Sequence, residues 1–240
     1  MTNLLRSEFI KTTTTRLVIW MGIATLLLSL LYLAIPLGLG LAVDEAAFND
    51  PAFISSLFAT TLSAAMFAML LGIVAMTAEF RHNTIAPTFL ATPKRERVLA
   101  AKAIVLAGIG AALGLAVYLV NVLVVLVVLA TKVHASIPWA TCFQSAGWTM
   151  LGFALFAAFG VTFGALLRGQ ATAIVVAVLW LLIAEGIVSV IRPEIGKWLP
   201  GQVLQGLGSD QSVISIAVLF AYIAAFGLAA ALTTLRRDVT

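Results

Sequence analysis

Long runs without a charged residue constrain this sequence more than any other feature. The first run, Leu17–Val43, lies between Arg16 and Asp44. An α-helix rises about 1.5 Å per residue, so about 20 residues cross a hydrocarbon layer of about 30 Å. Each run is long enough for one membrane-spanning helix, and we predict six of them. Their predicted ranges are 17–41, 53–78, 103–130, 146–167, 171–191 and 213–235.

The composition of the 240 residues agrees with a membrane protein. Apolar residues make up 62% of the chain and charged residues 10%, whereas soluble domains carry about 45–50% and about 25%. A water-soluble fold cannot hide this much apolar surface. A cytosolic enzyme, a nucleic-acid-binding domain and a disulfide-linked secreted module are therefore excluded. We predict an all-α membrane protein with a single transmembrane domain over residues 1–240.

The basic residues indicate how the predicted helices are oriented. With the N-terminus inside the cell, the segments on the cytoplasmic side hold 11 of the 14 Lys and Arg residues. Such an excess of positive charge is typical of cytoplasmic loops. We therefore expect a multi-pass protein of the inner (plasma) membrane with both termini in the cytoplasm, and we attribute the net charge of +4 to topology rather than to a nucleic-acid partner.

Residues 1–16 are predicted to form a short amphipathic helix on the inner leaflet. Leu5 and Phe9 are spaced i, i+4 and would share one apolar face. The polar residues are expected on other faces; they are Arg6, Ser7, Glu8 and Lys11. Such helices bind the membrane interface. The alternative is a frayed cytoplasmic tail.

The connection 79–102 between the second and third predicted helices is the longest charged stretch of the chain. Ile85 and Phe89 are spaced i, i+4, so a short helix could present both on one face. Exposed apolar residues on the cytoplasmic side usually have a partner. We predict a docking loop, and the alternative is a solvated connector that only sets the topology.

The segment 192–212 is expected on the outer side as a re-entrant or interfacial element. It contains Pro193, Pro200 and several glycines, which break a helix, yet it is too apolar for a free loop. Irregular backbone at membrane depth must be buried in protein or line water.

No catalytic or metal-binding constellation is found in the sequence. The phosphate-binding G-x-x-x-x-G-K-[ST] motif, H-E-x-x-H and paired cysteines are all missing. His82 and His134 are predicted on opposite sides of the membrane and cannot share a metal. We predict a subunit that is not itself an enzyme and holds no cofactor.

Glu185 is the one ionisable residue well inside a predicted span. Charged groups there are costly and often mark transport routes. We consider a translocation-path contact or an inter-helix hydrogen bond, and the alternative is a carboxylate that reaches the lipid headgroups. Two G-x-x-x-G patterns, which start at Gly110 and Gly160, predict close helix packing rather than chemistry.

Together these segments resemble the ABC-2 family of ABC transporter permeases, over nearly the whole chain. The resemblance is carried by Leu5-Arg6-Ser7-Glu8-Phe9-Ile10-Lys11, by Glu79-Phe80-Arg81 with Thr84-Ile85, and by Pro93-Lys94-Arg95 with Ala101-Lys102. It implies an exporter half that dimerises with a second copy or a homologous permease. It also implies two separate ATPase subunits that hold Mg-ATP, and a drug, peptide or lipid-like substrate.

The resemblance further implies which residues serve the coupling. The ATPase-coupling residues would be Glu79, Phe80, Arg81, Thr84, Ile85 and Phe89, and those of the interface helix Leu5, Arg6, Glu8, Phe9 and Lys11. The alternative function is an ion-gradient-driven secondary transporter or a channel, for which several intramembrane charges and inverted repeats are expected.

Overall fold

The computed structural model describes residues 2–43, 48–82, 95–133 and 139–233, and every regular element in these ranges is helical. Six helices are long and apolar enough to cross a membrane, which confirms the predicted number of spans and the membrane class. They are Leu17–Ala42, Ala52–Arg81, Glu96–Thr131, Trp139–Leu167, Gln170–Ile191 and Ser212–Thr233.

The N-terminal half consists of a short helix followed by three spans, of which the second is built from three pieces. Its elements are α1 (Thr2–Thr13), α2 (Leu17–Val43), α3 (Pro51–Ala59), the 3₁₀-helical η2 (Thr60–Ala65), α4 (Met66–Arg81), α6 (Arg95–Val128) and the π-helical η3 (Leu129–Val133). The start of α3 follows from its sequence, because the Asp50 side chain caps the helix and Pro51 occupies its first turn.

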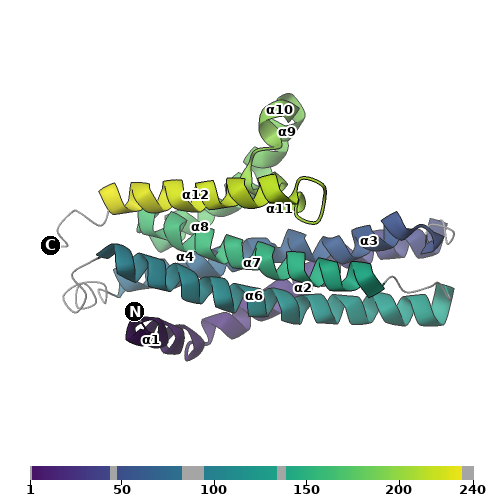
Figure 1. Cartoon of the computed structure of the whole chain (residues 1–240), viewed down its shortest axis with the longest axis horizontal. Coiled ribbons are helices and arrows are strands. Elements are labelled where there is room, and N and C mark those ends of the chain that lie inside the picture. The colour runs from purple at the N-terminus through teal and green to yellow at the C-terminus, as the bar shows by residue number, and fades with distance from the viewer. Residues whose placement is uncertain (1, 44–47, 83–94, 134–138, 234–240) are drawn as a thin grey trace.

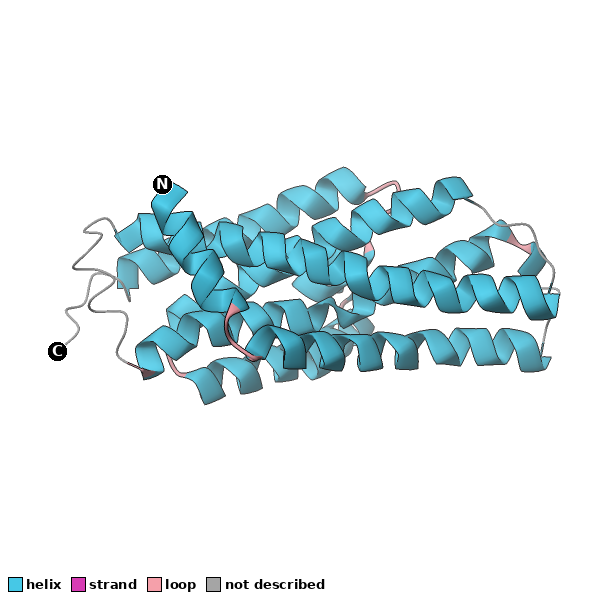
Figure 2. Cartoon of the chain, turned by 90° about the horizontal axis from the view of Figure 1, so that it is seen from below, coloured by secondary structure: helices cyan, strands magenta, loops and turns pink. Residues whose placement is uncertain are grey.

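The C-terminal half contains three spans and two short helices between the last two. Its elements are α7 (Trp139–Leu167), α8 (Gln170–Leu179), the π-helical η4 (Trp180–Ala184), α9 (Glu185–Ile191), α10 (Pro193–Gly196), α11 (Pro200–Gln205) and α12 (Ser212–Thr233). The long helices run side by side along the longest axis of the molecule (Figure 2).

The helices that flank the predicted connection 79–102 extend into it from both ends. α4 continues to Arg81 and α6 begins at Arg95, so Glu79 and Lys102 are helical residues. The charge pattern marks where apolar surroundings end, whereas a helix can continue beyond that point. Glu96 in the first turn of α6 favours this start through the helix dipole. The helix α7 likewise begins before the predicted span, at Trp139 rather than at 146.

α7 lies at the centre of the bundle, where it packs against α6, α4 and α12 (Figure 1). In its most apolar stretch 67% of the residues are buried, compared with 11% in the span Gln170–Ile191. Phe153 and Phe156 of α7 are among the largest completely buried side chains. The core of the protein therefore surrounds α7, and the fifth span stands at the periphery.

The crossing of α4 and α7 depends on two glycines that bring the backbones into contact. A Cβ atom on Gly160 would lie 2.0 Å from the carbonyl oxygen of Met69, and one on Gly72 would lie 2.2 Å from that of Ala157. Gly110 of α6 meets α7 in a similar way, at 2.7 Å from the carbonyl oxygen of Phe153. These contacts confirm the packing role predicted for the two G-x-x-x-G patterns.

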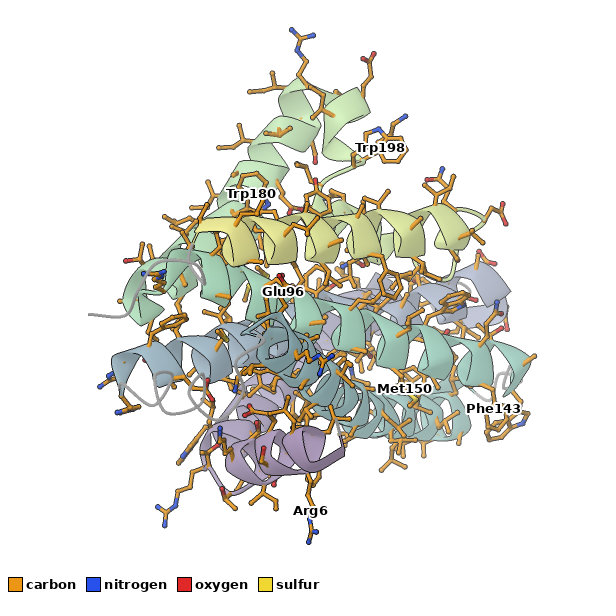
Figure 3. All side chains as sticks on the ribbon, turned by 60° about the vertical axis from the view of Figure 1, so that its left-hand side comes forward. Arg6, Glu96, Phe143, Met150, Trp180 and Trp198 are labelled. Carbon is orange, nitrogen blue, oxygen red and sulfur yellow. The ribbon has the colours of Figure 1, made fainter. Side chains whose placement is uncertain are left out.

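The segment between the fifth and sixth spans leaves the bundle and then returns to it. α9 and α10 stand away from the other helices, whereas α11 lies back beside α12 (Figures 1 and 3). Pro200, Val203 and Leu204 of α11 are buried. α1 and the C-terminal end of α12 lie at the same end of the bundle as the end of α4 (Figure 1).

Candidate functional site

Four charged side chains form a buried ion-pair cluster where α1, α4 and α6 meet. The residues of this ion-pair cluster are Glu8, Lys11, Glu79 and Lys102. Its centre is the Lys102 ammonium, which lies 2.5 Å from Glu8 Oε2 and 3.0 Å from Glu79 Oε1. Glu8 is 0% exposed and Lys102 is 2% exposed. Charged residues are rarely buried to this degree unless they are paired.

Lys11 completes the ion-pair cluster from the more exposed side. Its Nζ lies 2.9 Å from Glu8 Oε1 and 3.5 Å from Glu79 Oε1. The four formal charges therefore sum to zero, with each carboxylate close to both ammonium groups. Glu79 Oε2 is buried and accepts no hydrogen bond from the described residues, so this carboxylate is held on one side only.

The pairing shifts the pKa values of the two α1 residues in opposite directions. Burial alone would raise the pKa of Glu8, but Lys102 and then Lys11 outweigh it, and the pKa lies below its ordinary value. Burial would lower the pKa of Lys11, but its hydrogen bond to Glu8 and the charge of Glu79 raise it above the ordinary value. Both residues are therefore charged over the whole neutral range.

The face of α1 that contacts the bundle differs from the predicted apolar face. Leu5 packs on the main core and Glu8 and Thr12 are buried, whereas Phe9 is 52% exposed. The contact stripe thus follows the spacing i, i+3, i+7 and includes Glu8, which the sequence pattern does not place against the bundle; that Leu5 and Phe9 face the membrane interface stays a prediction. The cost of burying the Glu8 carboxylate is offset by its ion pair with Lys102 of α6. Arg6 points away from the bundle, as expected (Figure 3).

The other predicted coupling residues fall into two groups. Phe80 is half-buried against the core with the Arg168 guanidinium 5.9 Å from its ring centre, and Arg81 donates a 3.2 Å hydrogen bond to Gln170 Oε1. Both residues therefore tie the end of α4 to the start of the fifth span. Three residues lie outside the described part of the chain; they are Thr84, Ile85 and Phe89.

Lys102 is a residue of the ion-pair cluster that the sequence analysis does not single out as a site, although the sequence contains a signal for it. Lys102 is a single charge within the apolar stretch Val98-Leu99-Ala100-Ala101-Lys102-Ala103-Ile104-Val105. A lone lysine in such surroundings requires a buried counter-charge, and Glu8 and Glu79 provide it.

Glu185 forms a second site, at the point where the fifth span changes from π-helix to α-helix. Its residue exposure is 1%. Glu185 Oε1 accepts hydrogen bonds from Trp180 Nε1 at 3.0 Å and from the backbone N–H of Gly201 at 3.1 Å. The backbone N–H of Glu185 itself donates to the carbonyl of Trp180. The carboxylate thus links the π-helical turn η4 to the first turn of α11.

This geometry gives Glu185 the role of a helix cap supplied from another element. The N-cap residue of α11, Leu199, has no side chain that can accept a hydrogen bond, and the first N–H groups of a helix lack partners within it. Of the alternatives raised by the sequence, the contact between elements is the one observed. The carboxylate is turned into the protein and does not reach outward to headgroups.

Within the described ranges, no group of three or more His, Cys, Asp or Glu side chains is placed to hold a metal ion. The two sites described above are built from charge pairing and from hydrogen bonding. No protein-family model and no curated protein matches the chain, so its function has to be inferred from the geometry of the ion-pair cluster and of Glu185.

Proposed function

We propose that the chain is the membrane-spanning permease subunit of an ABC exporter. It pairs with a second copy or a homologous permease, and two separate ATPase subunits hydrolyse Mg-ATP for it. The six apolar helices support a role in the membrane. The 240 residues contain no phosphate-binding loop motif, so the proposal assigns nucleotide hydrolysis to a part outside this sequence.

The observation that carries this proposal is the ion-pair cluster at the two ends of the predicted docking loop. Glu79 lies near the end of α4 and Lys102 near the start of α6, and both are bonded to α1. A displacement of the loop therefore acts on α4 and α6 directly and on α1 through Glu8. Since α1 leads into α2, three spans are connected to a single point of attachment.

A partner that moves this point can drive transport by shifting the helices between two packings. We propose that Ile85 and Phe89 contact the ATPase subunit on the cytoplasmic side, where both termini also lie. Closure of the two ATPase subunits then biases the spans toward one packing, and their separation biases them toward the other. Alternation between the two moves a drug, peptide or lipid-like substrate outward.

Co-purification followed by a transport assay tests the proposal. The tagged chain, extracted from native membranes, is expected to bring down a nucleotide-hydrolysing subunit in equal number. Inside-out vesicles with both proteins are then tested for uptake of ethidium, a labelled peptide and a fluorescent phospholipid. At least one probe should enter with ATP and none without it. Uptake by the chain alone, driven by an ion gradient, would show a secondary transporter or channel instead.

Variants of the loop and of the ion-pair cluster separate docking from coupling. Ile85→Asp with Phe89→Asp is expected to release the ATPase, while Phe143→Asp, an equally polar change at an exposed residue of α7, leaves it bound (Figure 3). Lys102→Met is expected to retain the ATPase but to lose ATP-driven uptake. Normal transport by both the loop variant and Lys102→Met would overturn the proposed coupling route.

A further inference from the structure

The Glu185 carboxyl group accepts hydrogen bonds from fixed donors at two helix ends. Every group that bonds its carboxylate is a donor: the Trp180 indole, the Gly201 backbone and the Gln202 backbone. The hydrogen of a protonated carboxyl would find no acceptor among these three donor groups. The donors are also fixed in place by the helix ends that carry them. These donors offset part of the cost of a negative charge at this buried position.

This carboxylate has no cationic side chain as a partner within the described ranges. The ion pairs between described residues all belong to the ion-pair cluster, on α1, α4 and α6. Hydrogen bonds spread the charge but leave its total at minus one. A negative charge inside a span, away from water, attracts a cation more strongly than the same charge in solution.

Glu185 also lines a cleft, which gives the charge a place to act. The cleft has a volume of about 190 Å³ and lies between α2, η2, α7 and the returning α11. Its polar lining consists of Tyr32, Ser63, Glu185, Gln202 and Gln205, and its walls are otherwise apolar. Polar and apolar groups share the lining about equally, and polar groups that converge in a hollow of this kind can orient a small molecule.

We infer that this cleft binds a cationic group of a lipophilic ligand, with Glu185 as the counter-ion. The ligand class is that of tertiary or quaternary ammonium compounds with an apolar body. The carboxylate holds the ammonium, the tyrosine ring at position 32 offers an aromatic surface of the kind that attracts such groups, and the apolar walls hold the body. The inference rests on the proposed exporter function for its meaning, since the cleft then belongs to the transport route and favours cationic substrates.

Ligand binding can be measured on the chain alone, without nucleotide or ATPase. The protein is placed in nanodiscs of uncharged phosphatidylcholine, so that the lipid surface does not collect cations. Phenyltrimethylammonium is titrated calorimetrically, and tert-butylbenzene, which has the same shape without the charge, serves as competitor. Wild-type protein is expected to bind the cation, and the neutral isostere is expected not to displace it. Displacement of the cation by the neutral isostere at a similar concentration would overturn the inference.

Three variants make the result specific to Glu185. Glu185→Gln keeps an oxygen for Trp180 and Gly201 but removes the charge, and should weaken binding at least tenfold. Glu194→Gln removes the same charge from an exposed position on α10 and should not change it. If Glu185→Gln fails to fold, Gln205→Lys places a competing cation in the cleft with Glu185 intact, and should abolish binding.

Binding of the cation within twofold of wild type by a folded Glu185→Gln, or by Gln205→Lys, would overturn the inference. Failure of this binding assay leaves ATP-driven export of other substrates untouched. Conversely, if the chain binds the cation but no ATPase co-purifies with it, the proposed exporter function is contradicted and the inferred cation site is supported. The two proposals can therefore fail separately.

Discussion

Lys102 and Glu8 are 94 positions apart in the sequence, and their Nζ and Oε2 atoms lie 2.5 Å apart in the folded chain. This pair attaches an N-terminal helix of 12 residues to the third span. An isolated helix of that length is only marginally stable in water, so α1 depends on its contact with α6 for both its shape and its position.

Removal of one member of the Glu8–Lys102 pair should destabilise the protein strongly. Glu8→Leu or Lys102→Met leaves a buried charge with less compensation, at a cost of about 3–5 kcal/mol. The double variant should lose less than the sum of the two, because neither charge then remains alone. Denaturant unfolding in detergent, analysed as a double-mutant cycle, measures the difference. Strict additivity would mean that the two side chains do not interact.

An exchange of the two residues is not an equivalent test. Glu8→Lys would place a second ammonium beside Lys11, and Lys102→Glu would place a second carboxylate beside Glu79. Like charges at these distances repel each other, so the exchanged protein should be less stable than the neutral double variant. This order of stabilities distinguishes a cluster of four charges from an isolated pair.

The attachment of α1 should depend on pH only at the two extremes. The pKa of Glu8 is lowered, so its contribution is complete above the ordinary glutamate value of about 4.3 and is lost as the pH falls through the lowered pKa. The pKa of Lys11 is raised, so its contribution is complete below about 10.4 and is lost as the pH rises through the raised pKa.

Labelling of a cysteine introduced at Thr12, which is buried against the bundle, reports this attachment. The labelling rate should be constant between about pH 5 and pH 9, after correction for the ionisation of the thiol, and should rise in strong acid. In Glu8→Gln the cysteine should be reactive at every pH, with the acid step reduced. A step near neutral pH would contradict the assignment of both residues.

Replacement of Gly160 by alanine should be among the most damaging changes in α7. The added Cβ would lie 2.0 Å from the carbonyl oxygen of Met69. The Cβ is bonded directly to the backbone of α7 and the oxygen belongs to the backbone of α4, so neither atom can move away without moving its helix. Overpacking of this kind costs about 1–3 kcal/mol or more. Gly147→Ala in the same helix meets no atom within 4 Å and should be neutral or slightly stabilising. Thermal unfolding of the two variants in parallel measures the contrast.

Loss of the Trp180 indole should loosen α11 without unfolding the bundle. Trp180→Phe removes one of the donors to Glu185, and a hydrogen bond to a charged group contributes about 1.5–3 kcal/mol. Amide hydrogen exchange of α11 from Gly201 to Gln205 should increase. Trp139→Phe, at a residue that is 55% exposed, should leave this exchange unchanged. Unaltered protection of α11 in Trp180→Phe would show that Gly201 alone is sufficient to hold the carboxylate.

The six spans could be predicted from the sequence because the penalty for a charge in hydrocarbon is large and local. The end of each uncharged run therefore marks the edge of the membrane layer within a few residues. Helix ends are less predictable, since α6 retains Lys102 inside its first turns. The carboxylates of Glu8 and Glu79 stabilise the buried Lys102 ammonium, as water would stabilise it at an exposed helix end.

The two sites show the same limit at the level of side chains. Glu185 could be singled out because it is the one acid within its span, but Gly201, its partner, could not. That contact exists because the chain turns back after α10; the prolines and glycines of 192–212 indicate such a return, but not which residue it brings to Glu185. The burial of Glu8 could not be predicted from α1 alone, because it depends on Lys102, a residue of another helix.

The helices α9 and α10 project from the bundle, and this arrangement has a mechanical consequence. These helices form an arm with its pivot at η4, where the backbone hydrogen bonds already skip one residue more than in an α-helix. A few degrees of rotation at that pivot move the far end of the arm, where α9 turns into α10, over a larger arc than the pivot itself (Figure 3). A molecule bound to the outer face of the arm would therefore be displaced further than the residues beside Glu185.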